Sequence, residues 1–423
     1  MRRADELELT ILMPCLNEAE TLATCIAAAE WLRGHMLSGF PFDLLGYALT
    51  ANDEMLQLAS ITGVYGLTFI AALIASTGAL IWPADGRGLV ARLLPFFLAM
   101  GFIAAQIGYG NWRLSSTTVE PRTDMTARLI QPMILDHADW TAADPVNVMD
   151  RLISLSETRL TPTDPGLPEV THLIWPESVF PFFLTQYPDG LARIARMLPD
   201  DTLLLTGAPR EPLDATGEPI PDNPGYNSIL AIETNGEVVA SYDKSHLVPF
   251  GEYLPFADFW KLFGIRQFVP GTNGWAPGDG RRLMTPPGSP PFLALVCYEA
   301  IFPGDIGDVS KAEFILNITN DAWFDGSIGP AQHAHHARLR SVETGLPMLR
   351  ASNSGTTLVV DPLGRVTARL AEREVALIDA VPAKRLEGGT FYTRFGDWPL
   401  FGVLALGLAV SAFAAWRERR AGA

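Results

Sequence analysis

The sequence predicts an α/β domain attached to transmembrane helices. Crossing a bilayer takes about 20 apolar residues, and three runs without Asp, Glu, Lys or Arg reach that length: residues 56–83, 93–112 and 398–416. From about residue 125 to residue 379, short apolar runs alternate with helical stretches and Pro/Gly turns, a pattern typical of an α/β domain. The net charge of −16 argues against nucleic acid as a partner.

The first 34 residues have a different character. "LTILMP" indicates a buried strand, and "NEAETLATCIAAAEWL" indicates a helix with acidic residues in its first turn. This opening resembles that of family 2 glycosyltransferases, in which a strand is followed by Pro-x-x-Asn-Glu, but no nucleotide-binding segment follows it. A single strand has no sheet to join, so we expect residues 1–34 to pack poorly. Cys15 and Cys25 are predicted to be core cysteines.

Basic residues predict how the apolar runs lie in a membrane. "RERRAG" follows the last run, and Arg87 and Arg92 flank the short turn between the first two. Lys and Arg concentrate on the cytoplasmic side, so the turn and the C-terminus are predicted to be cytoplasmic. Both observations place residues 113–397 on the opposite side of the membrane.

Apolar runs in the central segment predict the strands of the α/β domain. They are residues 127–132, 171–176, 202–207, 227–233, 292–297, 314–319 and 356–361. Side chains that follow strands can meet at one edge of a sheet although they are distant in sequence. Three segments place ionisable groups there: "HLIWPESVF" with Glu177, "YDKSHLVPFGEYLPF" with Lys244 and Glu252, and "FLALVCYEAIF" with Cys297 and Glu299.

Each of these residues also has an ordinary structural explanation. Glu177 alone fits a helix-start carboxylate, Lys244 a solvated turn lysine, and Cys297 a buried thiol. Together they supply what thiol-based acyl transfer requires. A thiol needs a base to become a nucleophile, and a tetrahedral oxyanion needs a cation or an N–H donor.

The same residues resemble a known catalytic set. Glu177 in "WPES", Lys244 in "YDKSHLVPFGEY" and Cys297 in "CYEAIF" resemble the Glu-Lys-Cys triad of the nitrilase, or carbon–nitrogen hydrolase, superfamily. The wider order of "RLIQP", "YNSI", "NITNDAWFDGSIGPAQHAHHARLRSVETGLPMLRASNSG" and "DPLGR" resembles the apolipoprotein N-acyltransferase family. The likeness runs from about residue 39 to residue 416, and the "NDAWFDGSIGP" stretch is its most specific part.

This resemblance implies an αββα sandwich and a two-step acyl transfer. Cys297 would attack the sn-1 ester of a phospholipid, and the resulting thioester would pass its acyl chain to the α-amine of a diacylglyceryl-modified apolipoprotein. Glu177 would be the base and Lys244 the oxyanion partner. The residues that would support this triad are Glu252, Glu299 and Tyr298, whose backbone N–H would help to bind the oxyanion. No cofactor and no metal are implied.

The resemblance also implies a bacterial inner-membrane protein with a periplasmic catalytic domain. The family has several more spanning helices before the position that matches residue 39, so the membrane part is predicted to be N-terminally truncated. The predicted divisions are the opening fragment 1–34, a partial membrane domain 35–112, the catalytic domain 113–385 and a C-terminal transmembrane helix 398–416.

Several alternatives stay open at this point. The chain could be a membrane-tethered amidase in which water replaces the amine, or an inactive remnant that acts only as a membrane protein. The aromatic residues of "LVPFGEYLPFADFWKLFGI" fit either a lipid-facing loop or ordinary core packing. His333 and His336 in "AQHAHHARLR" share a predicted helix face, but no Cys or carboxylate set completes a metal site around them.

Overall fold

A computed structural model gives the structure of the chain. It describes residues 19–81, 88–134, 145–177, 179–214, 216–220, 223–256, 259–260, 262–263, 274–324 and 326–421. The chain divides into two compact units. The smaller is made of residues 1–118, 342–344 and 390–423, and the larger of residues 119–341 and 345–389.

The larger unit contains two six-stranded sheets. The first has the order β12-β1-β2-β3-β4-β5 and the second the order β11-β10-β9-β8-β7-β6. The strands of the first sheet are β1 (Ala127–Gln131), β2 (His172–Trp175), β3 (Leu203–Arg210), β4 (Tyr226–Ile232), β5 (Val238–Asp243) and β12 (Ala376–Ala380). Those of the second are β6 (Leu283–Met284), β7 (Phe292–Val296), β8 (Phe314–Thr319), β9 (Met348–Ser352), β10 (Leu358–Val360) and β11 (Val366–Arg369).

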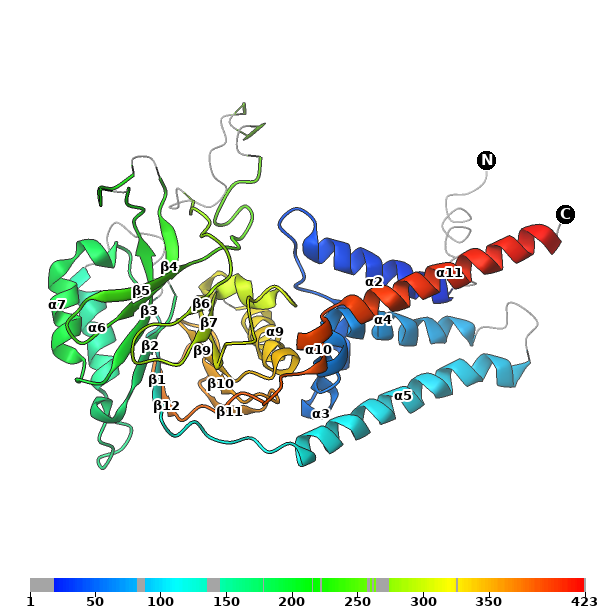
Figure 1. The fold of residues 1–423 in the computed structure, drawn as a ribbon, viewed down its shortest axis with the longest axis horizontal. Helices are drawn as coiled ribbons and strands as arrows, with labels where there is room; N and C mark the ends of the chain where they lie inside the picture. The colour runs from blue at the N-terminus through cyan, green and yellow to red at the C-terminus, as the bar shows by residue number, and fades with distance from the viewer. Residues whose placement is uncertain are drawn as a thin grey trace. The chain divides into compact units, whose positions relative to one another are not determined.

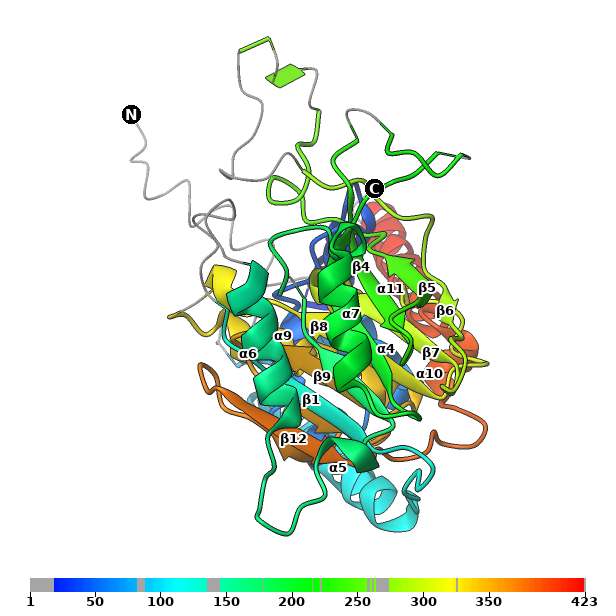
Figure 2. The ribbon, with the colours of Figure 1, turned by 90° about the vertical axis from the view of Figure 1, so that its left-hand side faces the viewer.

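Burial of apolar side chains on both faces of each sheet produces four layers. A core that includes Leu129, Ile229, Val296 and Leu316 fills the space between the sheets. A second core packs the outer face of the first sheet against α6 (Pro145–Glu157) and α7 (Pro188–Met197). A third packs the outer face of the second sheet against α9 (Gly329–Thr344). Figures 1 and 2 show this αββα order, which is the sandwich that the sequence predicted.

The strand directions place Glu177, Lys244 and Cys297 just beyond the C-terminal ends of three strands. β1, β2 and β3 are parallel, and two successive antiparallel pairings return β5 to the direction of β3. In the other sheet β7, β8 and β9 are parallel. Glu177 follows the end of β2, Lys244 the end of β5, and Cys297 the end of β7.

The smaller unit is made of helices. Within the described ranges, the α-helices are α2 (Ala19–His35), α3 (Asp53–Leu56), α4 (Ala59–Leu80), α5 (Leu89–Ser116), α10 (Phe391–Phe395) and α11 (Trp398–Ala421), and the 3-10 helix η1 (Leu45–Leu49) precedes α3. α4 is interrupted at Gly63, whose φ of 60° is left-handed. A Cβ at this position would lie 2.3 Å from the Tyr392 ring. The buried carboxylate of Glu343 accepts a hydrogen bond from the Val64 amide at 2.9 Å, which compensates for the break in the helix.

In the part of the chain that the structure describes, two helices are long and apolar enough to cross a membrane, and both lie where the sequence predicted spans. They are Ala59–Gly78 within α4 and Leu89–Ser116, which is α5. The third predicted span forms α11, in which Trp398–Phe413 is a shorter apolar helix. Large apolar side chains are exposed along α5 and α11, including Val90, Phe97, Leu406 and Phe413.

The opening segment differs from its prediction. α2 packs against α4 and α11, and Trp31 Nε1 donates to Asp397 Oδ2 at 3.1 Å. The expectation of poor packing was therefore wrong for this helix, because the helical bundle, and not a sheet, buries it. Cys25 is exposed and is not a core cysteine. The predicted strand 9–14 and Cys15 lie outside the described residues.

Candidate active site

Cys297 stands at the point where strand β7 turns into a short helix. The five residues of β7 are buried, and Cys297 begins the 3-10 helix η4 (Cys297–Ile301) with a φ of 52°. A left-handed conformation costs a non-glycine residue about 1–2 kcal/mol, so neighbouring contacts must hold it. The Val296 amide donates to Glu299 Oε2 at 2.8 Å, and the Cys297 carbonyl oxygen lies 3.1 Å from His333 Nε2.

Glu177 is held in place by two donors. Asn227 Nδ2 donates to its Oε1 at 2.6 Å, and the Asn320 amide donates to its Oε2 at 2.7 Å. Gly207 of β3 leaves the room for this residue, because a Cβ there would lie 2.6 Å from Glu177 Cα. Burial raises the pKa of the Glu177 carboxyl, and the Lys244 ammonium partly opposes this effect.

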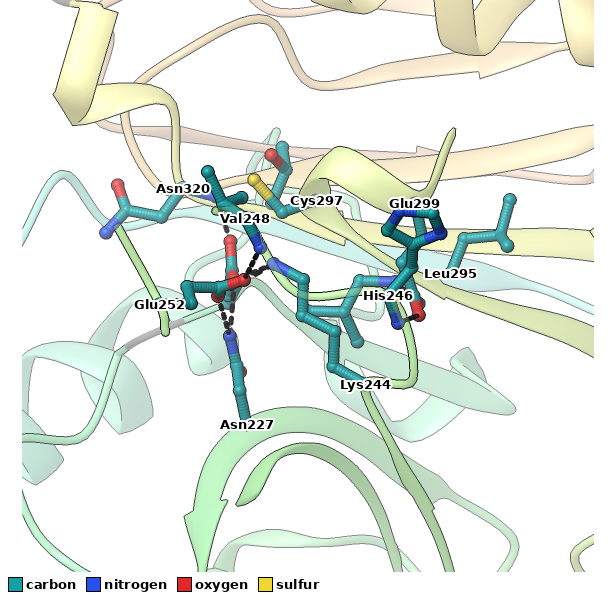
Figure 3. A network of polar contacts seen from close by, with 12 residues as sticks. Asn227, Lys244, His246, Val248, Glu252, Leu295, Cys297, Glu299 and Asn320 are labelled. Carbon is teal, nitrogen blue, oxygen red and sulfur yellow. Dashed lines mark hydrogen bonds and ion pairs between the residues drawn. The ribbon is translucent and has the colours of Figure 1, made fainter. Parts of the chain in front are cut away.

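Lys244 is a fully buried ammonium with two carboxylate neighbours. Its Nζ donates to Glu252 Oε1 at 2.8 Å and lies 3.8 Å from Glu177 Oε1. The second oxygen of Glu252 accepts from the Val248 amide at 2.8 Å, as Figure 3 shows. Burial lowers the pKa of Lys244, but the charges of Glu252 and Glu177 outweigh it and hold this pKa above its ordinary value.

The electrostatic surroundings keep Cys297 protonated at neutral pH. Burial and the negative charge of Glu177 raise the pKa of the thiol, and Lys244 opposes them only in part. Glu177 itself receives a hydrogen bond from Cys297. The arrangement is therefore a neutral thiol beside a carboxylate that can accept its proton.

Glu299 joins the nucleophile segment to the lysine segment. Its side chain is fully buried and accepts hydrogen bonds from the amides of Ser245 (2.8 Å), His246 (3.0 Å) and Val296 (2.8 Å). Tyr242 donates to the same carboxylate at 3.0 Å, and Arg281 forms an ion pair with it. Glu299 thus fixes the chain on both sides of the site.

Tyr298, the residue after the nucleophile, is buried by ring contacts. The ring packs against Phe302 at a centroid distance of 5.0 Å and against His246 at 5.8 Å. All six residues singled out in the sequence are thereby brought together: Glu177, Lys244, Glu252, Cys297, Tyr298 and Glu299.

The structure adds residues to the site that the sequence analysis did not assign to it. Asn227 bonds Glu177 and, at 3.3 Å, Glu252. Behind Cys297 lies a buried cluster of Asp321, His333 and Arg350. Asn227 lies in the "YNSI" motif and Asp321 in "NDAWF", but neither residue was assigned a function from the sequence.

The sequence indicated no Cys or carboxylate to accompany His333, and the structure corrects this, because Cys297 and Asp321 lie beside it. Among the described residues, the group with metal-ligand geometry is Cys297, Asp321 and His333, whose ligand atoms lie within 4.8 Å of one another. The Asp321 carboxylate is bonded to Arg350 Nη2 at 2.9 Å and to His333 Nδ1 at 2.8 Å. Its charge is already neutralised by the guanidinium, so the group has the chemistry of a buried ion-pair network.

Four phenylalanines among the described residues of the segment "LVPFGEYLPFADFWKLFGI", here called the aromatic loop, are exposed and not packed in a core. Phe250, Phe256, Phe259 and Phe263 are each between 48% and 71% exposed. Glu252 lies in the same loop and is bonded to Lys244. The exposed aromatic segment therefore begins directly beside the buried ions.

Comparison with known proteins identifies the family. The chain is 40% identical over 392 residues to the apolipoprotein N-acyltransferase of Bradyrhizobium diazoefficiens, covering 92% of this chain and 72% of that protein. The chain belongs to the apolipoprotein N-acyltransferase family. The corresponding protein of Rhodopseudomonas palustris is 39% identical over 389 residues, with 91% and 72% covered. This family member is thus an acyltransferase of the carbon–nitrogen hydrolase superfamily that acts in lipoprotein biosynthesis.

Family profiles match both parts of the chain. The profile described as Carbon-nitrogen hydrolase matches residues 174–387, and that of the Apolipoprotein N-acyltransferase N-terminal domain matches residues 9–77. The sequence suggested a glycosyltransferase-like opening for residues 1–34, but from residue 9 onward this segment matches the N-acyltransferase N-terminal domain instead. Among solved structures, an amidase from Nesterenkonia is similar with a TM-score of 0.40 and 18% identity, covering 68% of this chain and 98% of that chain.

Proposed function

We propose that this family member transfers an acyl chain from a phospholipid to an apolipoprotein through a thioester on Cys297. The observation that carries the proposal is the meeting of Glu177, Lys244 and Cys297 in one buried site, from the ends of three strands. Nucleophile, base and cation are each held by further hydrogen bonds, and such preorganisation is the main source of catalytic power in sites of this kind.

In the first step, the Cys297 sulfur attacks the sn-1 ester carbonyl while Glu177 takes the thiol proton. The raised pKa of the thiol means that deprotonation accompanies attack. Lys244 and the Tyr298 N–H stabilise the oxyanion. The ester C–O bond then breaks, and the proton passes from Glu177 to the departing alkoxide. A lysophospholipid dissociates, and the acyl chain stays on Cys297 as a thioester.

In the second step, the α-amine of the diacylglyceryl-cysteine attacks the thioester carbonyl. Glu177 takes a proton from the amine and returns it to the sulfur when the C–S bond breaks. The products are an amide on the apolipoprotein and the free thiol of Cys297. Glu177 serves as the base in both steps, for which its raised pKa is suited because a carboxyl with a higher pKa is a stronger base.

The exposed apolar surfaces support a membrane location for both steps. Each buried CH₂ of an acyl chain is worth about 0.8 kcal/mol, so neither substrate leaves a bilayer readily. We place α4, α5 and α11 in the bacterial inner membrane, with the C-terminus cytoplasmic and the catalytic domain, residues 113–385, periplasmic. The aromatic loop that includes Phe256 and Phe263 then contacts lipid and admits the acyl chain to the site.

Intact-mass measurement tests this proposal. Detergent-solubilised protein is incubated with phosphatidylethanolamine of defined chain length, alongside Cys297→Ala and the matched control Cys25→Ser. We expect a thiol-releasable gain of one acyl chain in the wild type and in Cys25→Ser, and none in Cys297→Ala. An unmodified wild type of native fold, or an adduct that survives in Cys297→Ala, would refute the assigned nucleophile.

Small amides test the alternative of a membrane-tethered amidase. The exposed aromatic loop favours a lipid donor, so hydrolysis of short aliphatic amides is expected to stay at background. Turnover of such amides without acyl loading from lipid would favour the amidase.

A further inference from the structure

His333 makes a contact to the nucleophile that the acyl-transfer mechanism does not use. Its Nε2 lies 3.1 Å from the Cys297 carbonyl oxygen and its Nδ1 lies 2.8 Å from Asp321 Oδ1. A carbonyl oxygen can only accept a hydrogen bond, so Nε2 must carry a proton and donate it. His333 is 1% exposed, so this contact lies away from bulk solvent.

The proton on Nε2 is compatible with the rest of the cluster. Arg350 Nη2 lies 3.3 Å from His333 Nδ1. Burial and the charge of Arg350 lower the pKa of His333, while Asp321 raises it. Both ring nitrogens face oxygens that can only accept, and the imidazolium donates to both of them, from Nδ1 to Asp321 and from Nε2 to the Cys297 carbonyl.

The contact acts on the peptide that joins Cys297 to Tyr298. The carbonyl of Cys297 and the amide N–H of Tyr298 belong to one planar unit and point in opposite directions. A donor that fixes the carbonyl oxygen therefore also fixes the direction of the N–H. This peptide follows a residue with a φ of 52°, a conformation that persists only where surrounding contacts impose it.

The cluster behind His333 is built to hold the ring still. Asp321 Oδ1 accepts from Thr319 Oγ1 at 3.0 Å, and Asp321 Oδ2 accepts from Arg350 at 2.9 Å. Gly355 provides the space for this carboxylate, since a Cβ there would lie 2.1 Å from Asp321 Oδ2. The acid, the histidine and the arginine are all at most 1% exposed.

We propose that His333 is a positioning residue that, held by Asp321 and Arg350, fixes the Cys297–Tyr298 peptide so that the Tyr298 N–H points at the oxyanion. This inference rests on the proposed function, because it assumes that Cys297 attacks a carbonyl. His333 itself does not touch the reacting atoms.

Two variants of similar size separate the hydrogen bond from the packing. His333→Gln retains an N–H donor that can reach the Cys297 carbonyl, whereas His333→Met fills the space without a donor. Each variant is assayed for acyl loading from phosphatidylethanolamine and for alkylation of Cys297 by iodoacetamide. Alkylation needs the thiolate but forms no oxyanion, so it reports on access and ionisation alone.

We expect His333→Met to slow acyl loading about 100-fold, the effect of a misplaced catalytic group, with alkylation close to the wild-type rate. His333→Gln should recover most of the loading rate. Equal loss of loading and alkylation in His333→Met, or loading at the wild-type rate, would overturn the inference. If His333→Met fails to fold, His333→Gln against the shorter His333→Asn decides, and equal loading by this pair would overturn it.

The wild-type results separate a failure of the proposed function from a failure of the role of His333. A wild type that is alkylated but never acylated contradicts the proposed function. A wild type that loads normally beside an equally active His333→Met contradicts only the role of His333.

Discussion

Replacing Glu252 by glutamine removes the carboxylate that holds the buried lysine of the site. Glu252 Oε1 accepts from Lys244 Nζ at 2.8 Å, and the next carboxylate, Glu177, lies 3.8 Å away. Removing one partner of a buried ion pair costs about 3–5 kcal/mol. The Glu252 side chain is 15% exposed, and Lys244 retains Glu177 as a second anionic neighbour. Because of this residual solvation and pairing, we expect the free energy of unfolding to fall by about 2–3 kcal/mol, less than that range.

This loss is measurable as a change in thermal unfolding. For a unit of this size, 1 kcal/mol corresponds to a Tm change of roughly 2–4 °C, so Glu252→Gln should lower the Tm by roughly 4–12 °C. Glu120→Gln is the matched control, because Glu120 pairs with Lys384 at 3.0 Å but both side chains are at least half exposed. Exposed pairs contribute little to stability, and the Tm of the control should stay close to that of the wild type.

The same variant also predicts a change in the pH dependence of acyl loading. The charge of Glu252 raises the pKa of Glu177, so its removal lowers that pKa. The acidic limb of the loading rate, where Glu177 becomes protonated, should then move to lower pH, while the maximal rate falls because Lys244 is no longer held. Equal Tm values for Glu252→Gln and Glu120→Gln, together with unchanged loading, would refute this reasoning.

Three further predictions follow from individual contacts. Gly207→Ala places a Cβ 2.5 Å from the Pro176 carbonyl oxygen, so it should displace Glu177 and slow acyl loading about 100-fold; Gly108→Ala, with open space around it, is the control, and equal rates would contradict the role of Gly207. Glu177→Gln should speed alkylation of Cys297 at fixed pH, because burial and then the Glu177 charge raise the thiol pKa, yet slow acyl loading about 100-fold or more by removing the base; slower alkylation would count against this. Burial lowers the pKa of His172 to about 4, so its contribution to stability is present above pH 6.5 and is lost as the pH falls toward 4. That loss is up to about 3 kcal/mol, and thermal unfolding of His172→Gln should vary less with pH over this range than that of the wild type, whereas an identical pH dependence would exclude the effect.

The strands of the fold were predictable where burial is continuous. β1, β2, β3, β7 and β8 are short apolar runs because both faces of their sheets are covered. β9 was missed because Arg350 interrupts its apolar character, and this buried arginine is compensated by its ion pair with Asp321 and its hydrogen bond to Asn317. β12 pairs with β1 although they are far apart in the chain, and no local pattern in the sequence reports such a pairing.

The site was predictable to the extent that its chemistry lies in ionisable side chains after strands. Glu177, Lys244 and Cys297 could be singled out for that reason. Asn227 lies inside a strand, and Asn320 contributes its backbone N–H, so neither position carried a signal. The link from His333 to the Cys297 carbonyl depends on how α9 packs against β7 and β8, which only the structure reveals.

The most direct test of the central claim follows the acyl chain from Cys297 to its acceptor. Wild-type protein loaded with a labelled acyl chain from phosphatidylethanolamine is freed of excess lipid and mixed with a diacylglyceryl-cysteinyl peptide. We expect the thioester label to disappear at the rate at which labelled amide appears on the peptide α-amine, and an N-acetylated peptide to leave the thioester intact. Release of the label as free fatty acid, at a rate independent of the peptide, would contradict acyl transfer from Cys297 to the amine.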